Sequence, residues 1–235
     1  MDATQVSSLS YRIITQLKNT SLFSGLYFLY YFQTMEIYLI RHTTPAVERG
    51  VCYGQTDLDV TDTFVQEAQA IKHVLPPTIQ QVFSSPLQRC AKLALRLFPQ
   101  HSIEFYPDLK EVHCGNWEMK RWNDIPKEIL QPWLDDFVQV NLPGGESYIE
   151  LQNRVANRFT AITTTAQASP VAIVSHGGVM RSILSHITQT PLIVSFELFK
   201  LYYGCVVKLV KTGHTFSYEI LHNVQPSEKE THRPS

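Results

Sequence analysis

An uninterrupted apolar run, VAIV at residues 171–174, constrains the fold of this chain more than any other feature. A strand that is apolar at every position must be buried on both faces, as a central strand is when helices cover both sides of its sheet. The polar tetrapeptide SHGG follows at residues 175–178, and a helix is predicted to begin near Val179. This order of strand, turn and helix is typical of an α/β domain.

The rest of the chain repeats this alternation. Apolar β-type runs predict further strands at residues 36–40, 79–83 and 103–106. Apolar residues at helical spacing predict helices over residues 64–74 and 146–163. One more helix is expected to run to Pro99, with Ser85 as its N-cap and Pro86 as its first residue.

Residues 203–210 and 215–221 flank the turn KTGH, which indicates a hairpin. We therefore expect a three-layer α/β sandwich with a mostly parallel central sheet flanked by helices. In such sheets the ligand crevice lies beyond the carboxyl ends of the strands.

The length of 235 residues fits one domain with an insert and extensions. We expect the domain to span residues 35–222. An irregular, aromatic and partly helical insert at about 107–145 is expected to lie over the active site. The polar residues 223–235 are expected to form a disordered tail.

Residues 1–34 are predicted to be an N-terminal extension outside the core, with Met35 as the natural start. Their apolar run at residues 22–32 is too short to span a bilayer, which needs about 20 residues. A weak membrane anchor and an extra packed helix are the alternatives.

The charge balance and the cysteine pattern argue against several classes of protein. With 20 Lys and Arg against 21 Asp and Glu, the chain has no global basic field to bind nucleic acid. None of the four cysteines forms a CxxC pair, so neither a zinc ribbon nor a disulfide framework is expected. Buried free thiols favour a reducing, cytoplasmic compartment.

Two histidines stand at strand ends, His42 after residues 36–40 and His176 after residues 171–174. A neutral imidazole is a nucleophile toward phosphorus, and Arg41 and Arg89 offer the planar fork that binds phosphate. A carboxylic acid must then protonate the departing alkoxide. Glu111 competes for this role with three neighbours: Asp108, His113 and Glu118.

Four ordered segments resemble the histidine phosphatase superfamily, also called the phosphoglycerate mutase-like family. They are LIRH at 39–42, SSPLQR at 84–89, LKEVHCGNWE at 109–118 and VSHGG at 174–178. The resemblance covers roughly residues 36–220. The segment CYGQTD at 52–57 looks most like the α-ribazole phosphatase branch.

The resemblance implies a role for each residue. His42 would be the nucleophile that becomes phosphohistidine, and Glu111 would protonate the leaving oxygen and then activate water. Phosphate contacts would come from Arg41, Arg89 and His176, and further substrate contacts from Gln55 and Gly177. Neither a metal nor an organic cofactor is implied, and the substrate would be a small-molecule phosphate monoester, α-ribazole 5′-phosphate in cobalamin biosynthesis.

The chain departs from the family pattern at four positions. Thr43 replaces the usual glycine after the nucleophile, and Glu48 replaces an asparagine that donates to phosphate. Pro45 occupies the place of a Ser or Thr, and Met119 that of a glycine. These substitutions affect the expected phosphate contacts more than the five catalytic residues.

Three other functions stay open at this point, of which a phosphatase with broad specificity for small molecules is the nearest to an α-ribazole phosphatase. A phosphoglycerate mutase would need more basic residues than Lys120, Arg121 and Lys127 of the insert, and it usually has a longer core than residues 35–222. A catalytically inactive phosphate-binding module would explain Thr43. The tryptophans of the insert, Trp117, Trp122 and Trp133, serve either packing or, together with Phe137, a stacking face for substrate.

Overall fold

The central strand β4 (Val171–Ser175) is buried at every residue, as its apolar sequence predicts. It lies between β2 (Gln81–Ser84) and β1 (Thr34–Arg41) and runs parallel to both. The structure is a computed structural model that describes residues 34–166 and 170–226. The interpretations made for residues 1–33 and 227–235 lie outside the described residues.

The sheet has six strands in the order β3-β2-β4-β1-β5-β6. The first four are mutually parallel and include β3 (Ile103–Phe105). The predicted hairpin supplies the other two, β5 (Val206–Thr212) and β6 (Thr215–His222), which are antiparallel to their neighbours. The predicted α/β class with a mostly parallel sheet is thus confirmed.

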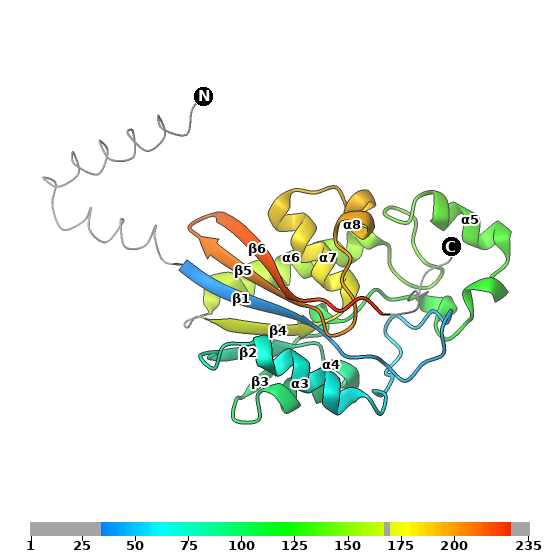
Figure 1. Ribbon diagram of the computed structural model, residues 1–235. Coiled ribbons are helices and arrows are strands. Elements are labelled where there is room, and N and C mark those ends of the chain that lie inside the picture. The colour runs from blue at the N-terminus through cyan, green and yellow to red at the C-terminus, as the bar shows by residue number, and fades with distance from the viewer. Residues whose placement is uncertain (1–33, 167–169, 227–235) are drawn as a thin grey trace, which may run out of the picture.

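Helices cover both faces of the sheet and make the three layers (Figure 1). Alternate strand residues such as Ile40 and Val174 pack under α3 (Phe64–Val74) and α4 (Gln88–Leu97). Their neighbours, such as Leu39 and Ile173, belong to the opposite core with α6 (Tyr148–Thr165) and α7 (Gly177–Thr188). The short helix α8 (Leu192–Leu198) follows α7.

The expected insert consists of short turns and one helix, α5 (Lys127–Asp135). Its 3₁₀ turns are Pro107–Leu109, Gly115–Trp117 and Trp122–Asp124. In Figure 1, α5 lies beyond the end of the sheet toward which β1 runs. The insert therefore stands where the carboxyl ends of the parallel strands open.

Two predicted boundaries are wrong for physical reasons. The helix expected to start at Pro86 begins only at Gln88, and Ser85 is not its cap, because the Ser85 amide still donates to Val174 of the sheet at 2.9 Å. Asn223, assigned to a disordered tail, is fixed by hydrogen bonds to Tyr202 and Lys200 of 2.9 and 2.6 Å. Within residues 34–166 and 170–226, no helix is long and apolar enough to cross a membrane.

Candidate active site

Three adjacent parallel strands end at the same edge of the sheet and bring the conspicuous residues together. Arg41 is the last residue of β1, and His42 follows it. Ser175 ends β4 and is followed by His176. The ladder continues one step further, because the His42 amide donates to the Ser175 carbonyl at 3.0 Å. Both histidines are buried, and their ring centroids are 5.1 Å apart.

The contacts of His42 indicate which ring nitrogen can act as the nucleophile. Nδ1 lies 2.7 Å from the Thr43 carbonyl oxygen. A carbonyl only accepts, so Nδ1 carries a proton, and whenever the ring is neutral its lone pair is on Nε2. The guanidinium Nε of Arg89 donates toward this atom at 3.4 Å. In its neutral form, His42 thus presents the lone pair of Nε2 to the cationic side of the site.

Arg89 is fully buried and is held by backbone carbonyls. Its Nη1 donates to Thr56 at 2.9 Å and its Nη2 to Gly54 at 2.8 Å. Arg41 stacks over the Tyr203 ring at 4.0 Å and donates to the Leu201 carbonyl. Carbonyl partners fix a guanidinium without cancelling its charge, so these contacts preserve the positive potential that a phosphoryl group requires.

His176 is neutral. Burial is the main cause that holds the pKa of His176 well below its ordinary value of 6.5, and the positive charges of Arg89 and Arg41 lower this pKa further. Its Nε2 lies 2.8 Å from the Ser85 hydroxyl, which also accepts from the Leu87 amide at 3.3 Å just before α4 begins. Ser85 is a site residue that the sequence pattern assigned to a structural task.

Glu111 comes from the insert and reaches the start of α7. Its Oε2 accepts from the Gly178 amide at 3.0 Å, and its Oε1 accepts from Val112 at 2.9 Å. A Cβ on Gly178 would stand 2.2 Å from Oε1, so this close approach requires glycine. The Gly178 amide therefore binds the carboxylate, while Gly177 lines the cavity beside Arg41.

The three other candidates for the acid role are either bound to other groups or exposed to solvent. Asp108 is paired with Arg158 at 2.6 Å. Glu118 accepts the backbone amides of Gln55, Thr56 and Cys114 at 2.8–3.0 Å. His113 is exposed. Of the carboxylates in the described part of the chain, Glu111 alone lines the cavity next to Arg41.

Gln55 does not line this cavity. Its side chain donates to the Glu111 carbonyl at 3.0 Å, so the structure places it behind Glu111. Glu48 is 72% exposed and pairs with Arg121 at the surface. Thr43 is buried, and only its carbonyl contacts His42. Met119 adopts the left-handed φ of 63° that favours the glycine it replaces.

A cavity of about 720 Å³ opens from Arg41, Glu111 and Gly177. Much of its wall is apolar and comprises Trp122, Trp133, Leu142, Tyr148 and Phe196. Two cations, Arg181 and Lys200, also line it, and no local sequence pattern had singled them out. Tyr203, which stacks on Arg41, also carried no local signal.

The tryptophans serve packing and also form part of the wall. All three are buried, and Trp122 stacks on Trp133 with centroids 5.6 Å apart. Trp117 meets both edge-on. Only Trp122 and Trp133 line the cavity, so Trp117 and Phe137 belong to the support of that wall. The four cysteines are buried and free, as predicted.

Similarity to known proteins shows the class to which this chain belongs. The sequence profile of the histidine phosphatase superfamily (branch 1) matches residues 37–224. The chain belongs to this superfamily, and it is a phosphatase. The resemblance stated from the four segments is confirmed.

Within the superfamily, the relatives carry several names. A metal-independent phosphoserine phosphatase of Arabidopsis thaliana is 32% identical over 67% of this chain and 70% of its own. An adenosylcobalamin/α-ribazole phosphatase of Salmonella typhimurium is 26% identical over 73% of this chain and 88% of its own. The crystal structure of a candidate α-ribazole-5′-P phosphatase from Escherichia coli shares the fold. Its TM-score is 0.75 at 21% identity, covering 82% of this chain and 97% of its own.

Proposed function

We propose that the protein is a metal-independent phosphomonoesterase that works through a phosphohistidine on His42. The observation that carries the proposal is the orientation of His42: the Thr43 carbonyl holds Nδ1, and Nε2 faces Arg89 within a site that also holds Arg41 and His176. Each of these groups suits the transfer of a phosphoryl group and needs no metal.

In the first step, His42 Nε2 forms a bond to phosphorus as the bond from phosphorus to the ester oxygen breaks. Arg41, Arg89 and His176 bind the equatorial oxygens, where charge develops. Glu111 gives its proton to the leaving oxygen, and the alcohol departs. In the second step, Glu111 takes a proton from water, which attacks phosphorus, releases phosphate and restores His42.

The preferred substrate is α-ribazole 5′-phosphate, an intermediate of cobalamin assembly. Tyr53 and Gly54 of the CYGQTD segment line the cavity, and Trp122 and Trp133 supply aromatic wall for its base. Relatives named as α-ribazole phosphatases support the assignment. A cytoplasmic location belongs to the same proposal and is supported by the four free, buried thiols.

A second candidate substrate is O-phosphoserine. Arg181 and Lys200 line the cavity and would attract the carboxylate of a small anionic alcohol. The relative from Arabidopsis thaliana is named as a phosphoserine phosphatase. Because α-ribazole has no such carboxylate, the two cationic side chains separate the candidates.

The test compares kcat/KM, with chelator present, for α-ribazole 5′-phosphate, O-phosphoserine, ribose 5-phosphate and 3-phosphoglycerate. Aromatic stacking of about 1–3 kcal/mol predicts that ribose 5-phosphate is poorer than α-ribazole 5′-phosphate by roughly ten- to a hundredfold. A preference for O-phosphoserine that disappears in Lys200→Met would select the second candidate. Phosphate appearing on a second oxygen of 3-phosphoglycerate would indicate a mutase.

A further inference from the structure

The proposed acid, Glu111, stands on a segment with no regular secondary structure. It lies between the turns Pro107–Leu109 and Gly115–Trp117, where neither a helix nor a strand ladder fixes the backbone. A misplacement of about 1 Å in a reacting group can cost roughly a hundredfold in rate. The position of Glu111 therefore has to be set by contacts from elsewhere in the chain.

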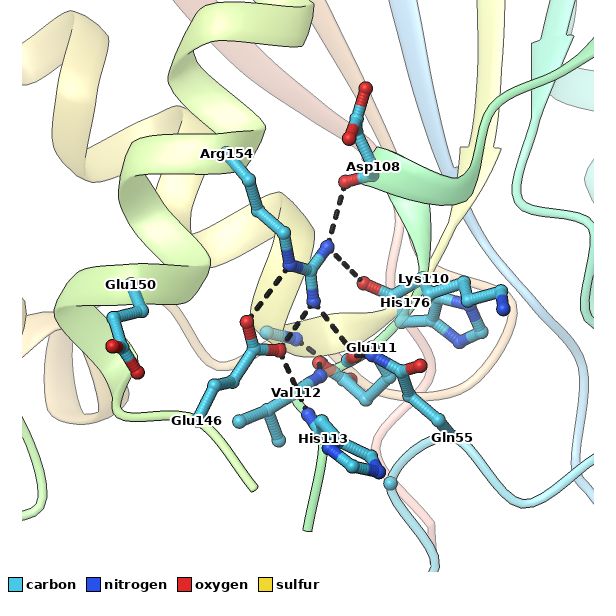
Figure 2. A network of polar contacts seen from close by, with 12 residues as sticks. Gln55, Asp108, Lys110, Glu111, Val112, His113, Glu146, Glu150, Arg154 and His176 are labelled. Atoms are coloured by element: carbon cyan, nitrogen blue, oxygen red, sulfur yellow. Dashed lines mark hydrogen bonds and ion pairs between the residues drawn. The ribbon is translucent and has the colours of Figure 1, made fainter. Parts of the chain in front are cut away.

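Arg154 of α6 supplies these contacts (Figure 2). Its guanidinium donates to three backbone carbonyls of the segment, those of Asp108 and Lys110 at 2.8 Å and that of Glu111 at 2.9 Å. It also donates twice to the Glu146 carboxylate, at 3.0 and 2.6 Å. These five hydrogen bonds match the five N–H donors of an arginine side chain.

Glu146 completes the arrangement on the other side of Glu111. Glu146 Oε1, which accepts from Arg154 Nη2, also accepts from the His113 amide at 2.8 Å. The Glu146 amide in turn donates to the His113 carbonyl at 3.0 Å. The side chains of Arg154 and Glu146 are only 21% and 16% exposed. Together they form a clamp, Glu146 and Arg154, that holds the backbone before and after the proposed acid.

We propose that Arg154, braced by Glu146, is a positioning residue that directs the Glu111 carboxyl group at the leaving oxygen. The inference rests on the proposed acid role of Glu111. Neither member of the clamp lines the cavity, so both act through the Glu111 backbone. A lysine could not replace Arg154, because three donors on one nitrogen cannot span carbonyls at three positions.

The test is the leaving-group dependence of kcat/KM in Arg154→Met. This parameter covers the steps up to release of the alcohol, so it reports the protonation of the leaving oxygen. Nitrophenolate departs without a proton, whereas an alkoxide needs one. We expect kcat/KM for an alkyl phosphate to fall about ten- to a hundredfold further than for nitrophenyl phosphate.

Arg158→Met is the matched control. Arg158 lies one turn further along α6 and contacts the same segment, through the Asp108 carboxylate at 2.6 Å and the Tyr106 ring at 4.1 Å. No hydrogen bond joins it to Glu111 among the described residues. We expect both substrates to respond equally in this variant. An equal response in Arg154→Met, or the same difference between substrates in Arg158→Met, overturns the inference.

Two further variants keep the result interpretable. Glu146→Gln removes a charge of the clamp with little change of shape, and it is expected to show the same difference between substrates even if Arg154→Met fails to fold. Glu111→Gln is the reference variant, because it changes the proposed acid itself. If it lowers kcat/KM equally for the alkyl phosphate and for nitrophenyl phosphate, the acid role of Glu111 is wrong, and so is the inference. If Glu111→Gln does lower kcat/KM more for the alkyl phosphate than for nitrophenyl phosphate, but neither Arg154→Met nor Glu146→Gln shows this difference, then only the inference about the clamp is wrong. Combining Arg154→Met with Glu111→Gln should add no further difference, because both changes remove one function.

Discussion

His42 and His176 show how one residue type acquires two tasks from its surroundings. The Thr43 carbonyl holds the proton of His42 on Nδ1 and leaves Nε2 to react. His176 lies 5.1 Å away, between ring centroids, and its burial beside Arg89 keeps it uncharged. A neutral His176 can contribute to the site without adding a further positive charge.

The lowered pKa of His176 predicts a pH dependence of folding. Below about pH 6.5, its ordinary value, the unfolded chain binds a proton that the folded chain excludes. The contribution of His176 to stability is therefore present above this pH and is lost as the pH falls below it, by at most about 1.4 kcal/mol per pH unit.

Urea unfolding of the wild type and His176→Gln at several values between pH 5 and 8 measures this contribution. The variant should show a shallower decline of the unfolding free energy on the acid side, because every other histidine is common to both proteins. Parallel curves would mean that the folded and unfolded chains bind the His176 proton equally, which contradicts the lowered pKa.

Local sequence patterns identified the site residues only in part. The strand ends at His42 and His176 could be predicted from apolar runs, since burial on both faces leaves a plain signature. Glu111 needed the family resemblance to separate it from Asp108 and Glu118. Arg154 carried no signal at all, because its partners at residues 108–111 are more than 40 positions away in the chain.

At the scale of elements, helix α6 links the fold to the site. Its first turn follows the glycine turn at residues 143–145, and Arg154 projects from its second turn onto the Glu111 segment. The sequence predicted this helix but placed its start at Glu146. The helix instead begins at Tyr148, after the N-cap Ser147, which leaves Glu146 free to reach His113 and Arg154.

The N-terminus of α6 is stabilised by a capping box. Ser147 Oγ accepts from the Glu150 amide at 3.3 Å, and the Glu150 carboxylate accepts from the Ser147 amide at 2.9 Å. Ser147→Ala should lower the unfolding free energy by about 1 kcal/mol, the usual cost of a lost cap. Chemical denaturation measures the change, with Thr163→Ala near the end of the same helix as control. An unchanged midpoint for Ser147→Ala would show that the box adds nothing to stability.

At the scale of the whole molecule, the site is assembled from segments far apart in the chain. Residues from the ends of β1, β2 and β4, from the insert and from the segment after α8 meet at one edge of the sheet. The fold class followed from local patterns because each element carries its own periodicity. The cavity could not be predicted from local patterns, because its walls combine residues of four separate segments. These residues are Trp122, Trp133, Arg181 and Lys200.

The family match begins at residue 37, and the first residue of the proposed site is Arg41. A protein that starts at Met35 is therefore expected to retain the kcat/KM of the full chain. Among the described residues, this truncation removes the pairing of Thr34 with Thr212 at the start of β1. Loss of activity on this truncation, with the fold intact by circular dichroism, would assign a role to the residues before Met35.

The central claim is the covalent intermediate on His42. The most direct measurement is a brief reaction with a radiolabelled phosphate monoester, followed by an alkaline quench and peptide mapping, in the wild type and in His42→Ala. Glu111→Gln should make detection easier, because the water that hydrolyses the intermediate then lacks its base. The account predicts acid-labile label on the peptide that contains His42 and neither label nor turnover in His42→Ala. Normal labelling of His42→Ala, or label on another residue, would contradict it.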